Sequence, residues 1–431
     1  MTRADRTPQT SLTVREACLV LFAELQPLES EVVPLSAALG RVLANNVVSP
    51  LALPPWDNAS MDGYAVRAAD VRGARGDAPV ALPVTETVAA GGVPTLPLAP
   101  ATAIRIMTGA PIPEGADSVI RVEDTDRGDK RVLIADARDA GRNVRPRGED
   151  IGAGEVAVEA GSVIGPAQLG VLASVGAARI AVHRKPRVAI LATGDELVDV
   201  DEFEQVLAGR RIVSSNSYTM RAGVQIAGAE VMDLGRCADN RAALKQRLEA
   251  ARDVGCDLIL TSGGVSVGTF DFTREVLREL GATMRFWRVK IRPGGPMGFG
   301  VLGSTPWLGL PGNPVSAMVT FELFARPAIR RLRGERLPFP RSILVTVDEE
   351  VSIAAPLTHF LRAVVSQDDA GTLRARLTGP QGSGLLTSMS RADVLLIVPL
   401  EQYGRGAIPA GTQLRALPLG ERGLLAAEPT P

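Results

Sequence analysis

The sequence predicts a multi-domain α/β plus β protein with a central, doubly wound parallel sheet. Residues 186–333 alternate between apolar strand-like runs and helical runs, a pattern typical of parallel sheets covered by helices on both faces. Residues 51–142 and 334–420 instead contain short strand-like runs separated by turns. The chain has 431 residues, which suggests two to four domains at roughly 100–200 residues each.

The N-terminal part begins with a predicted helix over Ser11–Leu25, where Thr13 and Glu16 have capping-box spacing. A second helical segment is expected over Ser36–Asn46, and a third begins at Pro166, because proline is favoured in the first turn. We therefore predict a discontinuous, helix-containing N-terminal domain that encloses a β-rich insertion domain. The ranges are 11–50 with 143–185 for the former, and 51–142 for the latter.

The α/β domain over 186–333 has the predicted strands RVAILAT, GAEVMDLG, CDLILTS and PWLGL. CDLILTS is apolar without alternation, as expected of a parallel strand that is buried on both faces. Helices are expected over Ser217–Ala227, Asn240–Ala251, Asp271–Leu280 and Val315–Arg330. Beyond residue 334 the helical pattern stops, and the runs RSILVTV, HFLRAVVS, LRARLTG and VLLIVPL predict a small β-barrel-like domain up to residue 420.

The composition excludes several classes of function. The formal net charge is -1 and aromatic residues make up 4%, so neither a basic field nor stacking platforms favour nucleic-acid binding. No apolar run reaches the ~18–20 residues of a membrane span. Only two histidines occur, and Cys18, Cys237 and Cys256 are widely spaced. A disulfide framework or a multi-histidine metal centre is therefore not expected, and we predict a cytoplasmic protein without membrane association.

Three loops follow predicted strands of the α/β domain: TGDEL, TSGGVSVGTFD and LPGNPVS. Ligands of open α/β sheets bind at this edge, glycines let the backbone approach them closely, and the N–H groups at a helix start attract anions. The alternative is that the glycines only make tight turns. No GxxxxGK[ST] or GxGxxG fingerprint accompanies the loops, which disfavours conventional ATP or NAD binding. The candidate binding residues are Ser262, Gly263, Gly264, Ser266, Gly268, Pro311, Gly312, Asn313 and Pro314.

Charged residues flank the same edge. The carboxylates are Asp195, Glu196, Asp239 and Asp271. Acidic groups beside phosphate loops commonly hold Mg²⁺ through oxygen ligands, although Asp239 and Asp271 could instead cap helices. The segment RFWRVKIRPGGP would, as one strand, point Arg288, Lys290 and Arg292 to one face and suit an oxyanion. A solvated edge strand is the alternative.

These motifs together resemble the MoeA/gephyrin-type molybdopterin molybdenumtransferase family, the molybdenum insertases. The resemblance extends along the chain in order and spacing, and is looser in the C-terminal β region. It rests on WDNASMDGYAVR, RIMTGAPIPEGADSVIRVEDT, VRPRGEDI, ATGDELV, SNSYTM, TSGGVSVGTFDF and LPGNPVSAMVTFELF.

The resemblance implies an elongated homodimer of four-domain subunits with a MogA-like α/β domain. Such an enzyme takes adenylylated molybdopterin and molybdate as substrates, inserts molybdenum at the pterin dithiolate and releases AMP. Mg²⁺ is the divalent metal implied, and a transient contact with the preceding adenylyltransferase is implied as well. The active site would combine the α/β domain of one subunit with the β-rich domain of its partner.

Carried over residue by residue, the resemblance assigns catalytic positions to Asp62, Thr108, Glu196, Asp239 and Asp271. The last three are also its metal-ligand candidates. It adds Arg362 and Ser383 to the substrate-binding residues and matches Arg288 and Arg292 to lysines of the family. At the third of these lysine positions the chain has Gly295, which puts the anion-binding arrangement and the preference for molybdate over tungstate in question.

Two other functions compete with this interpretation. The first is the adenylyltransferase that precedes insertion, which has a similar α/β domain but lacks the flanking regions found here. The second is a non-catalytic molybdopterin carrier or scaffold. A scaffold is expected to carry long interaction linkers, whereas this chain is compact and retains Asp62, Glu196 and Asp271.

Overall fold

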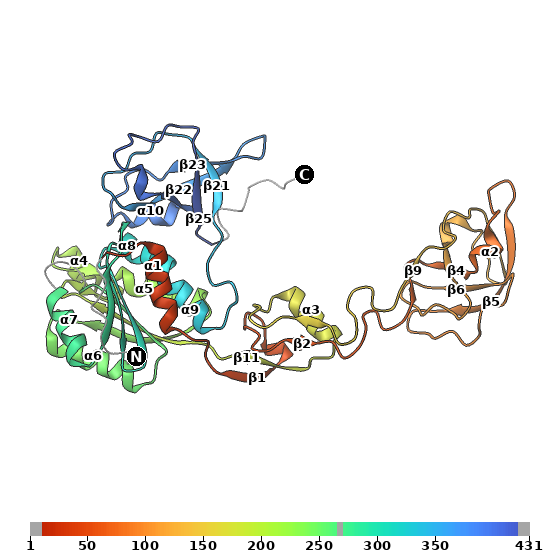
Figure 1. Ribbon diagram of the computed structural model, residues 1–431, viewed down its shortest axis with the longest axis horizontal. Helices are drawn as coiled ribbons and strands as arrows, with labels where there is room; N and C mark the ends of the chain where they lie inside the picture. The colour runs from red at the N-terminus through yellow and green to blue at the C-terminus, as the bar shows by residue number, and fades with distance from the viewer. Residues whose placement is uncertain (1–10, 265–269, 421–431) are drawn as a thin grey trace.

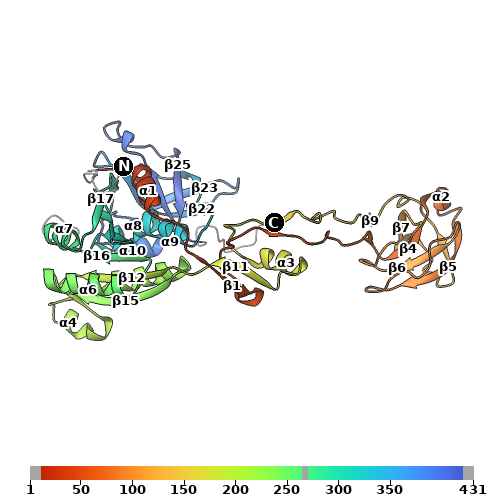
Figure 2. The same ribbon diagram turned by 60° about the horizontal axis from the view of Figure 1, so that its bottom comes forward.

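The computed structural model describes residues 11–264 and 270–420, with the side chains of residues 270–272 excluded. Four bodies form an elongated molecule (Figure 1). An α/β body and a β-barrel lie together at one end, a β-rich body lies at the other, and a small linking body joins them. The same separation is visible after a 60° turn (Figure 2). The domain limits predicted from the sequence stay a proposal.

The α/β body contains a six-stranded sheet in the order β15-β12-β16-β20-β19-β17. The first four strands are parallel. β19 runs antiparallel to both of its neighbours, β20 and β17, so β17 at the edge has the same direction as the first four strands. The predicted doubly wound sheet is therefore confirmed, but it is mixed rather than wholly parallel. The strands are β12 Arg187–Thr193, β15 Glu230–Cys237, β16 Leu258–Ser262, β17 Thr283–Arg288, β19 Pro296–Leu302 and β20 Thr305–Leu310.

Helices cover both faces of this sheet because its strands bury apolar side chains on both sides. Val188 and Ile190 of β12 belong to the core under α5 and α8, while Ala189 and Leu191 belong to the core under α6 and α7. The helices are α5 Ser215–Ile226, α6 Arg241–Asp253, α7 Phe270–Glu279 and α8 Pro314–Thr320, with α8 continuing through a π-helical turn, η4 Phe321–Ala325, into α9 Arg326–Leu332. Between β12 and α5 lies a flap made of β13 Leu197–Val198, η3 Val200–Glu202, α4 Phe203–Leu207 and β14 Ile212–Val213.

The first helix, α1 Val14–Glu24, is a structural part of the α/β body. The predicted capping box is present, since Thr13 Oγ1 accepts from Glu16 N at 3.3 Å and Thr13 N donates to Glu16 Oε2 at 2.8 Å. Leu21 and Leu25 are fully buried in the core that the sheet shares with α5 and α9. The sequence placed this helix in the N-terminal domain; its packing places it on the sheet, about 160 residues later in the chain.

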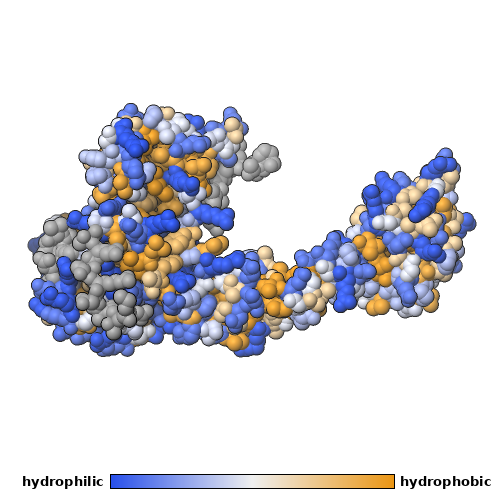
Figure 3. Space-filling model, in the orientation of Figure 1, coloured by the Kyte–Doolittle hydropathy of each residue, from blue (hydrophilic) through white to orange (hydrophobic). Residues whose placement is uncertain are grey.

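The C-terminal strands form a closed barrel. Their order is β22-β23-β21-β25-β24, and the pairing of β24 with β22 completes the ring. The strands are β21 Ile343–Val347, β22 Thr358–Gln367, β23 Leu373–Leu377, β24 Val394–Val398 and β25 Gln413–Pro418, with α10 Leu386–Arg391 and η5 Leu400–Gln402 between them. This confirms the predicted small barrel. Figure 3 shows apolar residues gathered where the barrel meets the α/β body.

The β-rich body is a curled five-stranded sheet in the order β7-β4-β6-β5-β8. Its elements are β4 Gly63–Val66, α2 Ala68–Val71, β5 Val80–Val88, β6 Ala103–Ile106, β7 Ser118–Arg121, η2 Val122–Asp124 and β8 Arg131–Ile134, and β3 Asn58–Ala59 pairs with β9 Val144–Arg145 beside it.

The linking body pairs β1 Ser30–Pro34 with β11 Arg179–His183, and β2 Val47–Val48 with β10 Val156–Val158, under α3 Pro166–Ser174. The helix predicted over Ser36–Asn46 is wrong: only η1 Leu35–Ala37 forms. Val42 and Leu43 instead make bridges to Val163 and Val182. No helix in the described part of the chain is long and apolar enough to cross a membrane.

Candidate active site

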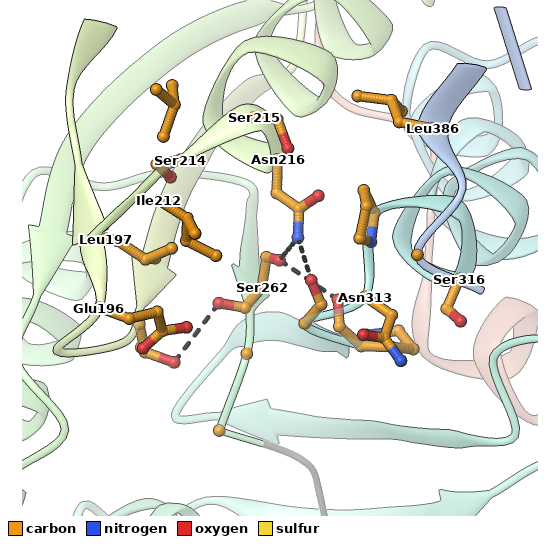
Figure 4. A pocket seen from close by; sticks show the side chains of 18 of the residues that line it. Glu196, Leu197, Ile212, Ser214, Ser215, Asn216, Ser262, Asn313, Ser316 and Leu386 are labelled. Carbon is orange, nitrogen blue, oxygen red and sulfur yellow. Dashed lines mark hydrogen bonds between the residues drawn. The ribbon is translucent and has the colours of Figure 1, made fainter. Parts of the chain in front are cut away.

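A pocket of about 630 Å³ lies at the carboxyl ends of β12, β16 and β20 (Figure 4). This is the edge at which the sequence placed the ligand, because parallel strands end side by side there. The pocket walls come from several parts of the chain: the end of β12, the flap, the start of α5, Asp239 before α6, the two glycine loops, the turn before β19, and the loop before α10. The last of these belongs to the barrel, so the pocket lies between the two bodies.

The first glycine loop needs its glycines for close packing. Gly263 and Gly264 have φ values of +91° and +68°. A Cβ on Gly263 would lie 2.5 Å from the carbonyl oxygen of Thr193, and one on Gly264 would lie 2.9 Å from Thr273 Oγ1. Gly263 N donates to Leu310 O at 3.1 Å. These glycines are therefore required for a tight turn, as the alternative interpretation proposed. The same loop also lines the pocket, where Ser262 adds a hydroxyl group to the wall. Ser266 and Gly268 lie outside the described residues.

The second glycine loop leads into α8 with Pro314 at the helix start and Asn313 at the N-cap position. The Asn313 side chain does not cap the helix; its Nδ2 donates to Ser383 Oγ at 3.0 Å. Val315 N donates to the carbonyl oxygen of Ser383 at 3.1 Å. Ser383 therefore ties the barrel to this loop, and its role in substrate binding stays a prediction. Pro311 and Gly312 also line the pocket.

Two of the three predicted metal-binding residues, Glu196 and Asp239, line the pocket. Asp239 is not a helix cap, because Asn240 Oδ1 accepts from Ala243 N at 2.8 Å and caps α6 instead. Its own Oδ1 is buried and has no hydrogen-bond partner among the described residues. Burial raises the pKa of Asp239, and the negative charges of Asp195 and Glu196 raise it further.

Asp271 belongs to the first turn of α7, and its side chain lies outside the described part. Among the described residues, no group of three or more His, Cys, Asp or Glu side chains could hold a metal ion. Mg²⁺ commonly needs only one or two protein carboxylates, with substrate phosphates and water completing its shell. The unpartnered oxygen of Asp239, beside Glu196, fits that chemistry.

The basic segment differs from its prediction. Arg288 ends β17 in the α/β sheet, whereas Arg292 belongs to β18 Ile291–Arg292, which pairs with β22 of the barrel. The chain changes sheets between them, so no single strand aligns the three cations. Both arginines are exposed, and the residues of this segment that line the pocket are Gly294 and Pro296.

Arg362 shows the strongest sign of an anion site. It is fully buried on β22, and its guanidinium donates to Ser388 Oγ at 3.1 Å and to the carbonyl oxygen of Gly382 at 3.0 Å. Its NH1 group has no partner in the described structure, and burial lowers its pKa. The acceptors lie in or beside the loop whose Gly384 and Leu386 line the pocket. A buried cation without a carboxylate is costly unless an anion joins it.

Asp62 and Thr108 form a closed pair in the β-rich body. Asp62 Oδ1 accepts from Thr108 N at 2.7 Å and from Thr108 Oγ1 at 2.8 Å. These hydrogen bonds hold the pKa of Asp62 below its usual range. Because the β-rich body lies at the far end of the molecule from the pocket (Figure 1), one chain does not bring this pair to the glycine loops.

Asn216 is a pocket residue that the sequence analysis did not single out. It lies in the first turn of α5, and its Nδ2 donates to Ser262 Oγ at 2.6 Å and to the carbonyl oxygen of Gly312 at 2.8 Å. In the sequence it stands in the polar run SSNS before a helix, where any member could be a cap. Only the fold shows which one reaches the loops.

Comparisons with known proteins cover nearly the whole chain. Residues 12–176 match the model "MoeA N-terminal region (domain I and II)", residues 189–331 match "Probable molybdopterin binding domain", and residues 345–419 match "MoeA C-terminal region (domain IV)". Molybdopterin molybdenumtransferase 2 of Mycobacterium tuberculosis is 40% identical over 89% of this chain and 93% of its own length. The Haemophilus influenzae molybdopterin molybdenumtransferase is 35% identical over 93% of this chain and 96% of its own. A crystal structure of a molybdopterin biosynthesis moeA protein from Pyrococcus horikoshii OT3 aligns with a TM-score of 0.81 and 28% identity, over 94% of this chain and all of that one.

Proposed function

Because the chain belongs to the MoeA family of molybdopterin molybdenumtransferases, we propose that it transfers molybdenum from molybdate to adenylylated molybdopterin and releases AMP. The observation that carries this proposal is the pocket itself. Donor groups of two glycine loops form one wall, carboxylates form another, and a buried arginine without a carboxylate lies behind the barrel loop. Such a site suits a phosphate ester together with a second oxyanion.

The residues divide by charge. Backbone N–H groups of the glycine loops and the second amide hydrogen of Asn313 bind the adenylate phosphates, while Ser262 lines the wall beside them. Arg362 and the Ser383 loop hold molybdate, a tetrahedral dianion that needs donors and cations; Arg288 and Arg292, which lie outside the pocket, contribute at longer range as exposed positive charges. Cleavage of the anhydride leaves new negative charge on phosphate oxygen, and donors already in place stabilise it without reorganisation.

Glu196 and Asp239 would hold Mg²⁺, and Asp271 is the third candidate from the sequence. The ion would supply positive charge that neutralises the phosphate oxygens. The protein's own task at these positions is to keep the carboxylates ionised and close together, although burial and then the charges of Asp195 and Glu196 raise the pKa of Asp239.

AMP release tests the proposed reaction. Purified protein is mixed with adenylylated molybdopterin, molybdate and Mg²⁺, and AMP is measured by chromatography. We expect AMP and active cofactor to form together, and we expect Asp271→Ala to lower AMP release by about a hundredfold or more with an unchanged melting temperature. Unchanged turnover in this variant would remove Asp271 from the mechanism. Consumption of ATP in place of AMP release would instead identify an adenylyltransferase.

We also propose that the active unit is a homodimer in which Asp62 and Thr108 of one subunit complete the pocket of the other. Their distance from the pocket within one chain supports this arrangement. So does an apolar groove of about 600 Å³ between α1 and the barrel, where Leu19 remains 64% exposed. The cytoplasmic location that we propose agrees with three free, buried cysteines.

Subunit mixing tests the shared site. Asp62→Ala and Asp239→Asn are each expected to inactivate the enzyme. Co-expressed with different tags and purified as the mixed dimer, they should regain about half of wild-type activity, because a two-fold dimer then has one site with both native residues and one with neither. A mixed dimer that stays inactive would show that each chain completes its own site. Mixing Asp239→Asn with Glu196→Gln, two changes in the same pocket, is the matched control and should restore nothing.

A further inference from the structure

We propose that Asn216 is a positioning residue that holds the two glycine loops at the spacing an anion requires. The inference rests on the proposed function, since it assigns a role within the same anion site. Asn216 lies on neither loop. It stands on α5, which packs against β12 and β15 at the opposite side of the pocket, and it reaches both loops through one amide (Figure 4).

The geometry makes Asn216 the junction between the loops. One N–H of its Nδ2 binds Ser262 Oγ in the first loop, and the other binds the carbonyl oxygen of Gly312 in the second. Ser262 Oγ donates onward to the carbonyl oxygen of Pro311 at 3.3 Å. Both amide hydrogens of Asn216 are thus used. Because the carbonyl oxygen of Gly312 can only accept a hydrogen bond, the Asn216 nitrogen and not its oxygen must face it, which fixes the orientation of the amide.

The loops need such a connection because β16 and β20 stop pairing where they begin. The strand register ends with Ser262 opposite Leu310, and Gly263 N to Leu310 O is the last backbone hydrogen bond between the loops within the described part of the chain. Beyond it, the two loops meet through van der Waals contact, since a Cβ on Gly312 would lie 3.6 Å from Gly263 Cα. The Asn216 amide adds directional hydrogen bonds to both loops at this point.

A second observation separates this role from ordinary core packing. Asn216 is 8% exposed, and its Oδ1 is buried without a hydrogen-bond partner in the described structure. Burying an unsatisfied acceptor is unfavourable, so the side chain is poorly explained as a contribution to stability. Its two donors are what the position requires. The Oδ1 atom points away from Ser262 (Figure 4).

The start of α5, which carries Asn216, also contacts the flap. Ser214 N, two residues earlier, donates to Val198 O at 2.9 Å, and Ser214 Oγ lies 2.7 Å from Ser217 Oγ. The flap residues Leu197 and Ile212 line the pocket. A ligand that displaces either loop therefore acts on α5 and the flap through Asn216.

Hydrogen exchange in the ligand-free protein tests the junction directly. Asn216→Asp keeps the side-chain shape but replaces the donor nitrogen with oxygen, so it breaks both bonds without opening a cavity. We expect peptides covering residues 258–264 and 308–316 to exchange faster together, in this variant and in Asn216→Ala. Asn46→Ala, which removes one 2.8 Å bond to Ala160 N in the linking body, is the matched control. Unchanged exchange in both loops would overturn the proposal.

AMP titration by calorimetry gives the functional readout. Removing the junction should weaken AMP binding about tenfold in Asn216→Ala, and by a further tenfold or more in Asn216→Asp, because a carboxylate there repels the phosphate. A merely structural role predicts the reverse order, since aspartate is the better steric match. That reverse order, or equal affinities, would refute a role in anion binding. Wild-type protein that binds no AMP would instead count against the proposed function, and the exchange experiment would still decide on Asn216.

Discussion

Arg362→Met is expected to abolish molybdate binding while the protein unfolds at the wild-type temperature or above it. Most buried arginines stabilise a fold through carboxylate partners, and their loss is costly. Among the described residues Arg362 has no such partner: its guanidinium contacts a serine hydroxyl and a backbone carbonyl, and NH1 is unsatisfied. Removing a buried charge that lacks a counter-ion relieves its desolvation cost, which offsets the loss of these hydrogen bonds.

The functional loss should be large because a buried cation meets its ligand with little screening. Hydrogen bonds to charged groups contribute about 1.5–3 kcal/mol each, so losing one or two of them lowers molybdate affinity by about tenfold at least and by more than about ten-thousandfold at most. The measurements are calorimetric titration with molybdate and thermal unfolding without ligand. Unchanged affinity would exclude Arg362 from the anion site. A strong loss of stability would show that its role is structural.

Arg184→Met is the matched control, because Arg184 is a partly buried arginine with carboxylate partners. It donates two hydrogen bonds of 2.6 Å to Asp257 and also pairs with Glu29. Its loss leaves Asp257 uncompensated, at a cost on the order of 3 kcal/mol. We expect lower stability and unchanged molybdate affinity, the opposite of the result for Arg362→Met.

The sequence predicted those elements whose structure depends only on neighbouring residues in the chain. The run in β12 is apolar at every position from Val188 to Ala192, and only a strand covered on both faces buries all of these. The capping box at Thr13 is equally local. In contrast, nothing local encodes that β17 and β19 run antiparallel, since their side chains alternate in the same way in either direction.

Pairing between residues far apart in the sequence explains the two clearest differences between the predicted elements and the structure. Arg292 leaves the α/β sheet because Ile291 and Arg292 pair with Thr358 and His359, about 65 residues later. Residues 36–46 avoid a helix because Val42 and Leu43 bridge to strands more than 100 residues away. Each partner lies far outside any local window, so helical periodicity alone could not reveal these pairings.

The sequence predicted the location of the candidate site, at one edge of the sheet, but not the contacts that its residues make. Strand order places the TGDEL, TSGG and LPGN loops together. Whether Asp239 or Asn240 caps α6 depends on backbone angles, because both residue types are good caps and stand next to each other. That one-residue difference leaves Asp239 free for the pocket. Asp62 and Thr108 were predicted only through the family resemblance.

The raised pKa of Asp239 is expected to make stability depend on both pH and Mg²⁺. Its pKa is raised by burial and by the charges of Asp195 and Glu196, so the folded protein holds this proton at a higher pH than the unfolded chain does. Without metal, its contribution to stability is therefore greatest below the unfolded pKa of about 3.9 and falls as pH rises through the raised value. Mg²⁺ bound to the ionised carboxylate should offset this loss, so its stabilising effect should grow with pH over the same window.

Asp239→Asn should separate stability from activity. The variant is expected to melt at or above the wild-type temperature at pH 7, to lose the stabilisation by Mg²⁺, and to release AMP about a hundredfold or more slowly.

Asp139→Asn is the control, because its expected effect on stability has the opposite sign. Arg121 holds the pKa of Asp139 below its usual range through hydrogen bonds of 2.7 and 2.9 Å, so its loss should destabilise the β-rich body at neutral pH and leave the response to Mg²⁺ unchanged. Thermal unfolding from pH 4 to pH 8, with and without Mg²⁺, measures both. An Asp239→Asn protein that Mg²⁺ still stabilises as strongly as the wild type would place the metal elsewhere.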